Sequence, residues 1–459
     1  MLAAPEIDVP KGARLPFRPV LLLRVPLPSV LSAWLLLQLS GCGARSQLDV
    51  EGMTSPVDAS DQCPSAVSGP RPMAANCSTR DGRSRVSATG APHVTWSTQL
   101  PTNGSAYLGP GVLATDAAGH AYVLTIYQAG SNPAALLRVR TSDGAVEWTA
   151  PVDPDQETNV PIVLSHGGID VFAYAPGEVD SMVTFDPSTG ATTSTTFGLG
   201  LQGAVADSAV GADGSLYITH EDEAAGAHPP TFVSRVSPGG DVLWTSVDFW
   251  TLIPPTTNPA GIEPSLVALA KADLVVIGVQ TPDVGTVVNA FDPTTGATRW
   301  STTFNGALNG GPTIRPDGTI ALLIATNLVL LDPETGAATA THPLPGVGAA
   351  IWAVTKGGTL IMGIMPPGLA VLTAAVDGEG TPLWTSQILG YATLASDGTI
   401  VVLGVTTITA LDGETGATKW ELQAPQPGDP NACFIDAALT SEGGLVALAC
   451  DGTLLSVSD

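Results

Sequence analysis

Hydrophobic residues in this chain occur in short runs that are separated by glycine-containing turns. Before Trp420, for example, Asp397-Gly398 precedes the run Thr399-Ile400-Val401-Val402-Leu403, a bend follows at Gly404, and a second run begins at Ile408. Runs of this length between turn residues are typical of β-strands, and their continuous apolar character indicates strands buried on both faces. No long segment has helical periodicity, so the pattern predicts an all-β protein.

A longer pattern joins these strands in pairs. Ala410-Leu411-Asp412-Gly413-Glu414-Thr415-Gly416-Ala417-Thr418-Lys419-Trp420 ends one strand at an acid, turns, and places Trp on the next strand. The acid can accept bonds from the turn amides, and the glycine supplies a positive φ. The motif recurs along the chain, with Ser194 and Ala340 at the Trp position in two copies and no turn before Trp96. The repeat residues are Trp96, Trp148, Trp244, Trp300, Trp384 and Trp420, with Gly144, Gly190, Gly240, Gly296, Gly336, Gly380 and Gly416, and Asp186, Asp292, Asp332 and Asp412.

The spacing of the motif predicts a β-propeller of four-stranded blades over residues 93–459. The Trp-equivalent positions 96, 148, 194, 244, 300, 340, 384 and 420 lie 36 to 56 residues apart, which is the range of one blade. They predict eight blades, or seven if 148–194 or 336–384 is not a full blade. Three strands follow Trp420, and the strand around Trp96 completes their blade by pairing N- and C-terminal segments, which removes exposed edges.

The pattern Ala-x-Asp-x-x-x-Gly-x-x-x-Trp resembles the tryptophan-docking repeat of the PQQ-like (quinoprotein alcohol dehydrogenase-like) β-propeller superfamily. The resemblance covers roughly residues 93–459. That superfamily includes quinoprotein alcohol dehydrogenases and the non-enzymatic propeller lipoprotein of the bacterial outer-membrane β-barrel assembly machine. The resemblance therefore implies the fold, whereas function has to be argued separately.

The N-terminus has the features of an export signal. Four basic residues precede the apolar run Val30 to Leu39, which is too short to span a bilayer comfortably. Leu39-Ser40-Gly41-Cys42 resembles the lipobox of bacterial lipoproteins, in which the cysteine is acylated; an ordinary secretory signal is the alternative. We expect a lipoprotein signal peptide at 1–41, lipidation of Cys42, and a flexible Ser-, Pro- and Ala-rich tether at 42–92.

The four remaining cysteines indicate an oxidising compartment. Cys433 and Cys450 flank two apolar runs, and folding that hairpin about Glu442 and Gly443 brings the two cysteines opposite each other. We expect this disulfide, and a second one between Cys63 and Cys77 within the tether.

Charge and motifs narrow the classes of function. The chain has 17 Lys and Arg against 42 Asp and Glu, a net charge of −25, which disfavours nucleic acid. It has neither an adjacent cysteine pair for a quinone nor a Cys-x-x-Cys-His haem motif. The segments His220 to Glu223 with His228, and Asp153 to Glu157, are interpreted as loops and not as metal sites. We therefore expect no enzymatic activity, no cofactor and no metal.

These observations lead to a binding or scaffold protein of the bacterial cell envelope. By resemblance it is an outer-membrane lipoprotein, facing the periplasm or the cell surface, with a monomeric propeller that contacts envelope or outer-membrane proteins. The long insertions 153–161, 221–231 and 250–264 are the expected contact loops. The alternatives are a PQQ- and calcium-dependent oxidoreductase, or a surface propeller that binds carbohydrate or another small ligand.

Overall fold

The computed structural model describes residues 92–100, 112–125, 134–152, 163–165, 168–173, 181–197, 205–211, 213–221, 231–247, 264–270, 274–281, 285–367, 371–425 and 432–458. The chain divides into Met1–Leu39 and Ser40–Asp459, and every described residue belongs to the second unit. The signal peptide, most of the tether, Cys42, Cys63 and Cys77 lie outside the described residues and remain predictions. Within these ranges no helix has the length and apolar character needed to cross a membrane.

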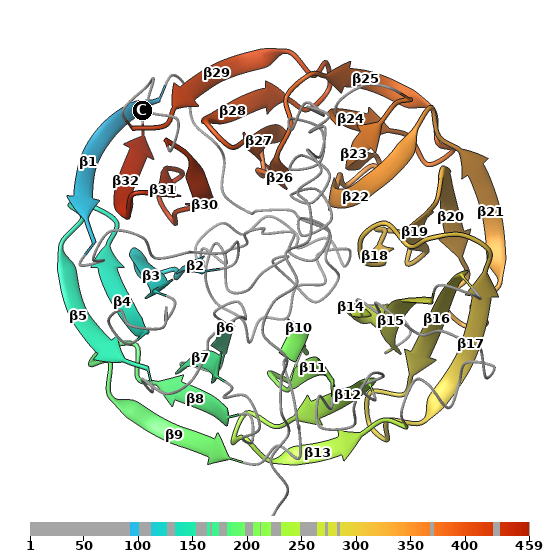
Figure 1. Ribbon diagram of the computed structural model, residues 1–459, viewed down its shortest axis with the longest axis horizontal. Coiled ribbons are helices and arrows are strands. Elements are labelled where there is room, and N and C mark those ends of the chain that lie inside the picture. The colour runs from blue at the N-terminus through green and yellow to red at the C-terminus, as the bar shows by residue number, and fades with distance from the viewer. Residues whose placement is uncertain are drawn as a thin grey trace, which may run out of the picture. The chain divides into compact units, whose positions relative to one another are not determined.

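The described strands form eight four-stranded sheets arranged as the blades of a ring (Figure 1). We number the blades in chain order, and the first strand of each lies nearest the centre. Blade 1 contains β2 (Leu113–Thr115), β3 (His120–Thr125), β4 (Ala135–Arg140) and β5 (Val146–Pro151). Blade 2 contains β6 (Val163–Ser165), β7 (Gly168–Ala173), β8 (Ser181–Phe185) and β9 (Thr192–Phe197). Blade 3 contains β10 (Val205–Val210), β11 (Leu216–Glu221), β12 (Thr231–Val236) and β13 (Val242–Thr245).

The next three blades follow the same order. Blade 4 contains β14 (Pro264–Ala270), β15 (Leu274–Thr281), β16 (Gly285–Phe291) and β17 (Thr298–Phe304). Blade 5 contains β18 (Thr313–Ile314), β19 (Ile320–Ile324), β20 (Asn327–Leu331) and β21 (Ala338–Pro343). Blade 6 contains β22 (Val347–Val354), β23 (Leu360–Met365), β24 (Leu372–Val376) and β25 (Pro382–Ser386).

The last two blades bring the chain back to its start. Blade 7 contains β26 (Tyr391–Leu394), β27 (Thr399–Leu403), β28 (Thr407–Asp412) and β29 (Thr418–Gln423). Blade 8 contains β30 (Phe434–Leu439), β31 (Leu445–Ala449), β32 (Thr453–Ser458) and β1 (His93–Gln99). The predicted all-β propeller of four-stranded blades is confirmed, and the segments 148–194 and 336–384 both contribute complete sheets.

Blade 8 closes the ring because its outermost strand comes from the other end of the described chain. β1 pairs antiparallel with β32, from His93 opposite Ser458 to Gln99 opposite Thr453. In the same blade, Cys433 and Cys450 form a disulfide with a Cα–Cα distance of 5.2 Å. The covalent link joins the two chain segments that flank the β30–β31 hairpin, so it holds together the last blade to be completed.

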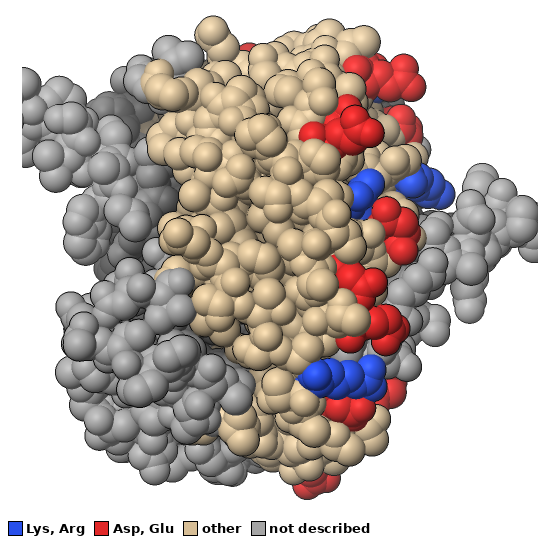
Figure 2. Space-filling view, turned by 90° about the vertical axis from the view of Figure 1, so that its right-hand side faces the viewer, with Lys and Arg blue, Asp and Glu red and all other residues tan. Residues whose placement is uncertain are grey.

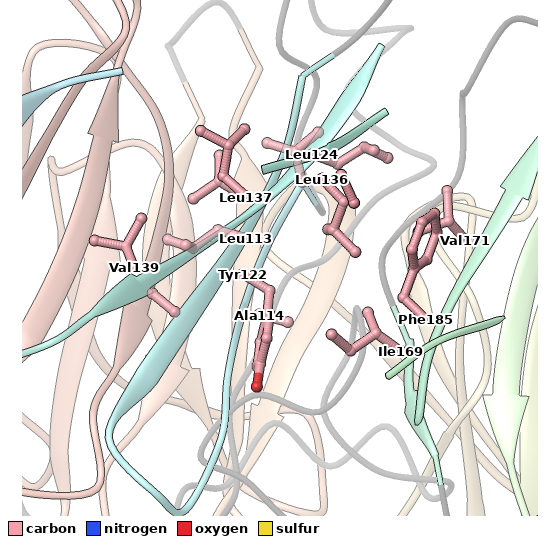
Figure 3. Packing of buried hydrophobic residues seen from close by; sticks show 14 of the residues in the cluster. Leu113, Ala114, Tyr122, Leu124, Leu136, Leu137, Val139, Ile169, Val171 and Phe185 are labelled. Atoms are coloured by element: carbon pink, nitrogen blue, oxygen red, sulfur yellow. The ribbon is translucent and has the colours of Figure 1, made fainter. Parts of the chain in front are cut away.

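The burial of each strand follows from its sequence. Middle strands such as β19 and β27 are buried at every position, whereas the outermost β29 alternates between exposed and half-buried residues. Clusters of apolar side chains fill the space between neighbouring blades. Figure 3 shows Ile169, Val171 and Phe185 of blade 2 pointing toward Leu124 and Leu136 of blade 1. The core is therefore a series of interfaces between sheets.

Tryptophans on the outermost strands anchor most of these interfaces. Trp300 of blade 4 is 8% exposed, and its Nε1 donates a 2.9 Å hydrogen bond to the carbonyl of Pro333 in the β20–β21 turn of blade 5. Gly336 of that turn, at φ +68°, lies flat against the indole, where a Cβ would overlap the ring. Four other docked sets have the same form: Trp96 with Thr141 and Gly144, Trp148 with Pro187 and Gly190, Trp244 with Pro293 and Gly296, and Trp384 with Gly413 and Gly416.

The turn between the third and fourth strands of a blade receives the tryptophan of the preceding blade, and we call it the receiving turn. Its length differs between docked and undocked junctions. In each of the five docked turns the glycine amide bonds to the carbonyl four residues earlier, as Gly336 does to Asp332. The two other described turns between third and fourth strands are one residue shorter, with Gly240 bonded to Ser237 and Gly380 to Asp377. Their neighbouring blades carry Ser194 and Ala340 at the Trp position. A blade without the tryptophan therefore faces a short turn, which lacks the longer glycine turn (the platform) on which an indole lies.

Two glycine substitutions separate docking from backbone strain. Gly336→Ala and Gly398→Ala both place a side chain at positive φ, but the added Cβ meets Trp300 in the first case and nothing within 4 Å in the second. We expect Gly398→Ala to lower the free energy of unfolding by about 1–2 kcal/mol. Gly336→Ala should cost about 1–3 kcal/mol more, because the indole must move. Urea unfolding measures both, and equal losses would show that the ring does not depend on this contact.

Candidate functional site

The antiparallel order of the strands gives the ring two different faces. Connections between first and second strands, and between third and fourth strands, lie on one face, which we call the turn face. All other connections lie on the opposite face, which we call the loop face. The insertions 153–161, 221–231 and 250–264 join strand ends on the loop face, although they lie almost wholly outside the described residues. The expected contact loops thus belong to one side of the ring.

Acidic side chains gather on the turn face. Figure 2 views the ring edge-on and shows Asp and Glu along one rim, with few Lys and Arg and little other charge on the described surface that faces the viewer. This distribution gives the rim a negative potential. The described acids of these turns are Asp116, Asp143, Asp186, Asp213, Asp241, Asp292, Asp317, Asp332, Glu334, Asp377, Glu379, Asp397, Asp412, Glu414 and Glu442.

The aspartates of the docked turns accept hydrogen bonds from residues of the same hairpin. Oδ1 of Asp292 accepts from the amides of Thr294 and Thr295 at 2.9 Å, and its Oδ2 accepts from Arg299 at 2.7 Å. The bond from Arg299 and these amides lower the pKa of Asp292 to about 2. Hydroxyl and amide donors likewise lower the pKa of Asp186, Asp332 and Asp412. These acids therefore shape the turns, as well as giving the face its charge.

Blade 1 carries the densest group of charges. Nδ1 of His120 lies 3.0 Å from Asp116, which also accepts a 2.8 Å bond from the hydroxyl of Tyr122. Nε2 of His120 lies 2.8 Å from Arg138, whose Nε lies 3.3 Å from Glu147. One tautomer satisfies both contacts of the ring, with Nδ1–H donating to Asp116 and Nε2 accepting from Arg138. Burial, followed by the charge of Asp116, raises the pKa of Tyr122, so its hydroxyl remains a donor.

The arginine of this group also reaches the next blade. Arg138 lies directly opposite Trp148 on the neighbouring strand and donates a 3.4 Å bond to the carbonyl of Ser188 in blade 2. Arg235 of blade 3 repeats the arrangement, lying opposite Trp244 and donating a 2.9 Å bond to the Pro293 carbonyl. The geometry therefore assigns these charges to joining blades.

Sequence reasoning missed both arginines. The aligned positions opposite Trp300, Trp384 and Trp420 are alanines, and the motif was defined by that alanine. An arginine at the same place, ten residues before Trp148 and nine before Trp244, was the signal that would have found them. Their cross-strand neighbours are the tyrosines Tyr122 and Tyr217.

His220 lies in the interior and not in an exposed loop. It is 2% exposed, its Nε2 lies 3.0 Å from the hydroxyl of Ser234, and its Nδ1 has no hydrogen-bond partner. Burial lowers its pKa to about 3. Glu221 ends β11, and the remaining residues of the candidate acidic segment, with His228 and Asp153 to Glu157, lie outside the described ranges. Among the residues that the structure does describe, no three His, Cys, Asp or Glu side chains converge to hold a metal ion.

Comparison with known proteins supports the repeat and the fold. A protein-family model described as outer membrane protein assembly factor BamB matches residues 283–362. No curated protein sequence matches the chain. The predicted resemblance to the PQQ-like β-propeller superfamily is confirmed by this match and by the architecture of similar solved structures.

Three solved structures share the fold over most of their length. The quinohemoprotein alcohol dehydrogenase from Comamonas testosteroni superposes with a TM-score of 0.60 at 12% identity, over 83% of this chain and 79% of that one. Quinohemoprotein alcohol dehydrogenase ADHIIG from Pseudomonas putida HK5 gives 0.56 at 10% identity, over 83% and 79%. A europium-containing methanol dehydrogenase gives 0.54 at 12% identity, over 81% and 87%. At such identities the likeness establishes the fold alone.

The expectation that this protein is not an enzyme requires correction. All three of these structures are dehydrogenases, so the architecture found here is one that oxidoreductases use. The missing adjacent cysteine pair and covalent haem motif do not exclude activity, because the propeller itself requires neither feature. The sequence therefore does not support the expectation that the protein lacks enzymatic activity.

The buried histidine predicts a measurable pH dependence. Its pKa is about 3 in the folded protein and about 6.5 in an unfolded chain. Below pH ~6.5 His220 is protonated in the unfolded chain but remains neutral in the folded protein. The contribution of His220 to stability is therefore complete above that pH and declines as the pH falls. Between pH 7 and pH 4, His220→Gln should lose less free energy of unfolding than the wild type in urea titrations. Equal losses would contradict a buried, neutral His220.

Proposed function

We propose that this protein is a binding scaffold of the bacterial cell envelope that contacts envelope or outer-membrane proteins. The observation that carries the proposal is the match of residues 283–362 to the outer membrane assembly factor family. The matched segment contains the docked turns Asp292–Gly296 and Asp332–Gly336 together with Trp300. It therefore includes a complete unit of the repeat that orders the ring.

The proposed contact surface is the loop face. A closed ring of sheets is a rigid support, and long loops on a rigid support commonly carry binding. The short turns of the opposite face hold their own aspartates, as Asp292 does through Thr294, Thr295 and Arg299. The insertions 153–161, 221–231 and 250–264 connect strands on the loop face.

Attachment to the membrane is the second part of the proposal. Acylation of Cys42 would anchor the chain, and the segment 43–92 would act as the tether between the lipid and the propeller. By analogy with the matched family, the outer membrane is the proposed location, with the propeller on its periplasmic or cell-surface side.

A dehydrogenase is the second candidate, and the three solved structures favour it. The superfamily would imply a pyrroloquinoline quinone with a metal ion, which supplies oxidising power when bound. The described residues do not fit such a group, because they contain no cluster of metal-ligating side chains. This candidate therefore rests on the comparisons and not on an assembled site.

Affinity capture of the tagged, full-length protein from gently solubilised envelopes tests the scaffold. We expect enrichment of outer-membrane barrel-assembly proteins, and their loss when the insertion 250–264 is shortened. The paired change Glu334→Gln and Glu414→Gln on the turn face is the matched control, since it removes two exposed charges and no loop. Recovery of the protein alone would refute the proposal, and a Cys42→Ala variant reports whether capture requires the anchor.

The second candidate has an independent assay. The purified propeller is mixed with pyrroloquinoline quinone and Ca²⁺, and thermal unfolding and dye reduction with a primary alcohol are followed. A saturable rise in melting temperature with alcohol-dependent dye reduction would establish the dehydrogenase. Neither response at saturating cofactor would reject it, whatever the capture experiment shows.

A further inference from the structure

The interface between blades 2 and 3 is constructed differently from the docked interfaces. Ser194 occupies the Trp position on the outermost strand of blade 2, where it lies opposite Thr184. The receiving turn of blade 3, from Ser237 to Gly240, belongs to the short class. This interface therefore lacks both the indole and the full platform that join, for example, blades 4 and 5.

The two faces of blade 2 have opposite character. Side chains alternate along a strand, and cross-strand partners share a face. Ile169, Val183 and Phe185 pack into the apolar cluster shared with blade 1. The alternate positions Asp170 and Thr184 therefore face blade 3. Asp170 is 3% exposed and accepts a 2.7 Å hydrogen bond from the hydroxyl of Thr184.

The face of blade 3 that lies toward blade 2 also carries polar groups. Trp244 points toward blade 4, so its neighbour Thr245 points toward blade 2, together with its cross-strand partner Ser234. Ser234 is 0% exposed and links the two other groups, lying 2.8 Å from the Thr245 hydroxyl and 3.0 Å from Nε2 of His220. These hydrogen bonds, like that between Asp170 and Thr184, join residues of one blade.

Apolar residues share this interface without dominating it. By the same alternation, Phe172 and Met182 of blade 2 and Leu216 and Ile218 of blade 3 face the junction, and all four are buried. Apolar burial stabilises an interface in proportion to its area, and a tryptophan is among the side chains that bury the most. The junction between blades 2 and 3 therefore lacks the aromatic burial that stabilises a docked pair.

A second undocked interface, between blades 5 and 6, has substitutes for the tryptophan. Leu323 and Leu330 of blade 5 and Ile351 and Met362 of blade 6 belong to one apolar cluster. Arg315 of blade 5 extends to the turns of blade 6, so close that a Cβ on Gly378 would lie 2.7 Å from its terminal nitrogen. The third undocked interface lies between blades 7 and 8, because no turn joins β32 to β1 to receive Trp420. There Trp420 packs against an apolar cluster that includes Leu403 of blade 7 and Leu439 of blade 8. Of the three undocked interfaces, the one between blades 2 and 3 is thus the most polar.

We propose that the ring opens at the interface between blades 2 and 3, a seam formed by Asp170, Thr184 and Ser194 on one side and His220, Ser234 and Thr245 on the other. In a chain of repeats whose stability is the sum of neighbour contacts, the weakest contact separates first. By chain connection, the insertion 153–161 precedes the seam, while 221–231 and 250–264 follow it. Opening the seam changes the spacing between these loops and does not depend on what they bind.

Thiol labelling under native conditions measures the opening. Ser234→Cys places a buried thiol at the seam, and Thr409→Cys places one at the equivalent position of blade 7, facing the docked junction with blade 6. The two positions are 0% and 1% exposed, and mass spectrometry of the full-length protein separates them from the native cysteines. We expect labelling at least about tenfold faster for Ser234→Cys. Ser208→Cys on the same face provides a second reporter if Ser234→Cys fails to fold.

Introducing a tryptophan dock between blades 2 and 3 tests whether its absence causes the opening. Ser194→Trp, combined with replacement of the Ser237–Gly240 turn by the Asp292–Gly296 sequence, should slow labelling of the Ser234→Cys thiol to the rate of Thr409→Cys. Ala374→Cys reports the blade 5–6 interface at the same strand position and should label at an intermediate rate. Equal rates for the three thiols, or no slowing in the restored variant, would overturn the proposal.

Discussion

The ring depends on one contact above all, the indole of one blade lying flat on a glycine of the next. Each half requires the other, since the hydrogen bond from Trp300 to Pro333 positions the ring over Gly336, and the positive φ of that glycine leaves no room for a side chain. The contact stabilises the interface by aromatic burial and fixes the relative orientation of two sheets through a directional bond. Repeating it converts hairpins with little stability of their own into a closed structure.

The interfaces are nevertheless unequal, and the inequality is encoded on both sides. Ser194 faces the short turn ending at Gly240, and Ala340 faces the short turn ending at Gly380. At one junction aliphatic side chains and Arg315 replace the indole, while at the other buried polar groups do so. A ring tolerates such variation because every blade has two neighbours, so no single interface has to supply all of its stability.

The comparisons also show how little of the function the ring determines. The same architecture is found in alcohol and methanol dehydrogenases, and part of the chain matches an outer membrane assembly factor. Chemistry or recognition in such a fold resides in the loops and in side chains that converge from several blades. An adjacent cysteine pair and a covalent haem motif are features of particular enzymes and not of the fold, so their absence from the sequence does not establish inactivity.

The sequence determined the local and periodic features of this protein. Strand class, four-stranded blades, and closure by the strand around Trp96 follow from apolar runs, turn residues and spacing, each of which is set within some 50 residues. It did not distinguish the two turn classes or assign a role to Arg138 and Arg235. Nor did it show that His220 is buried beside Ser234. Those features depend on which side chains meet from different strands and blades, and only the packed ring decides that, because an interface forms when two surfaces are present together.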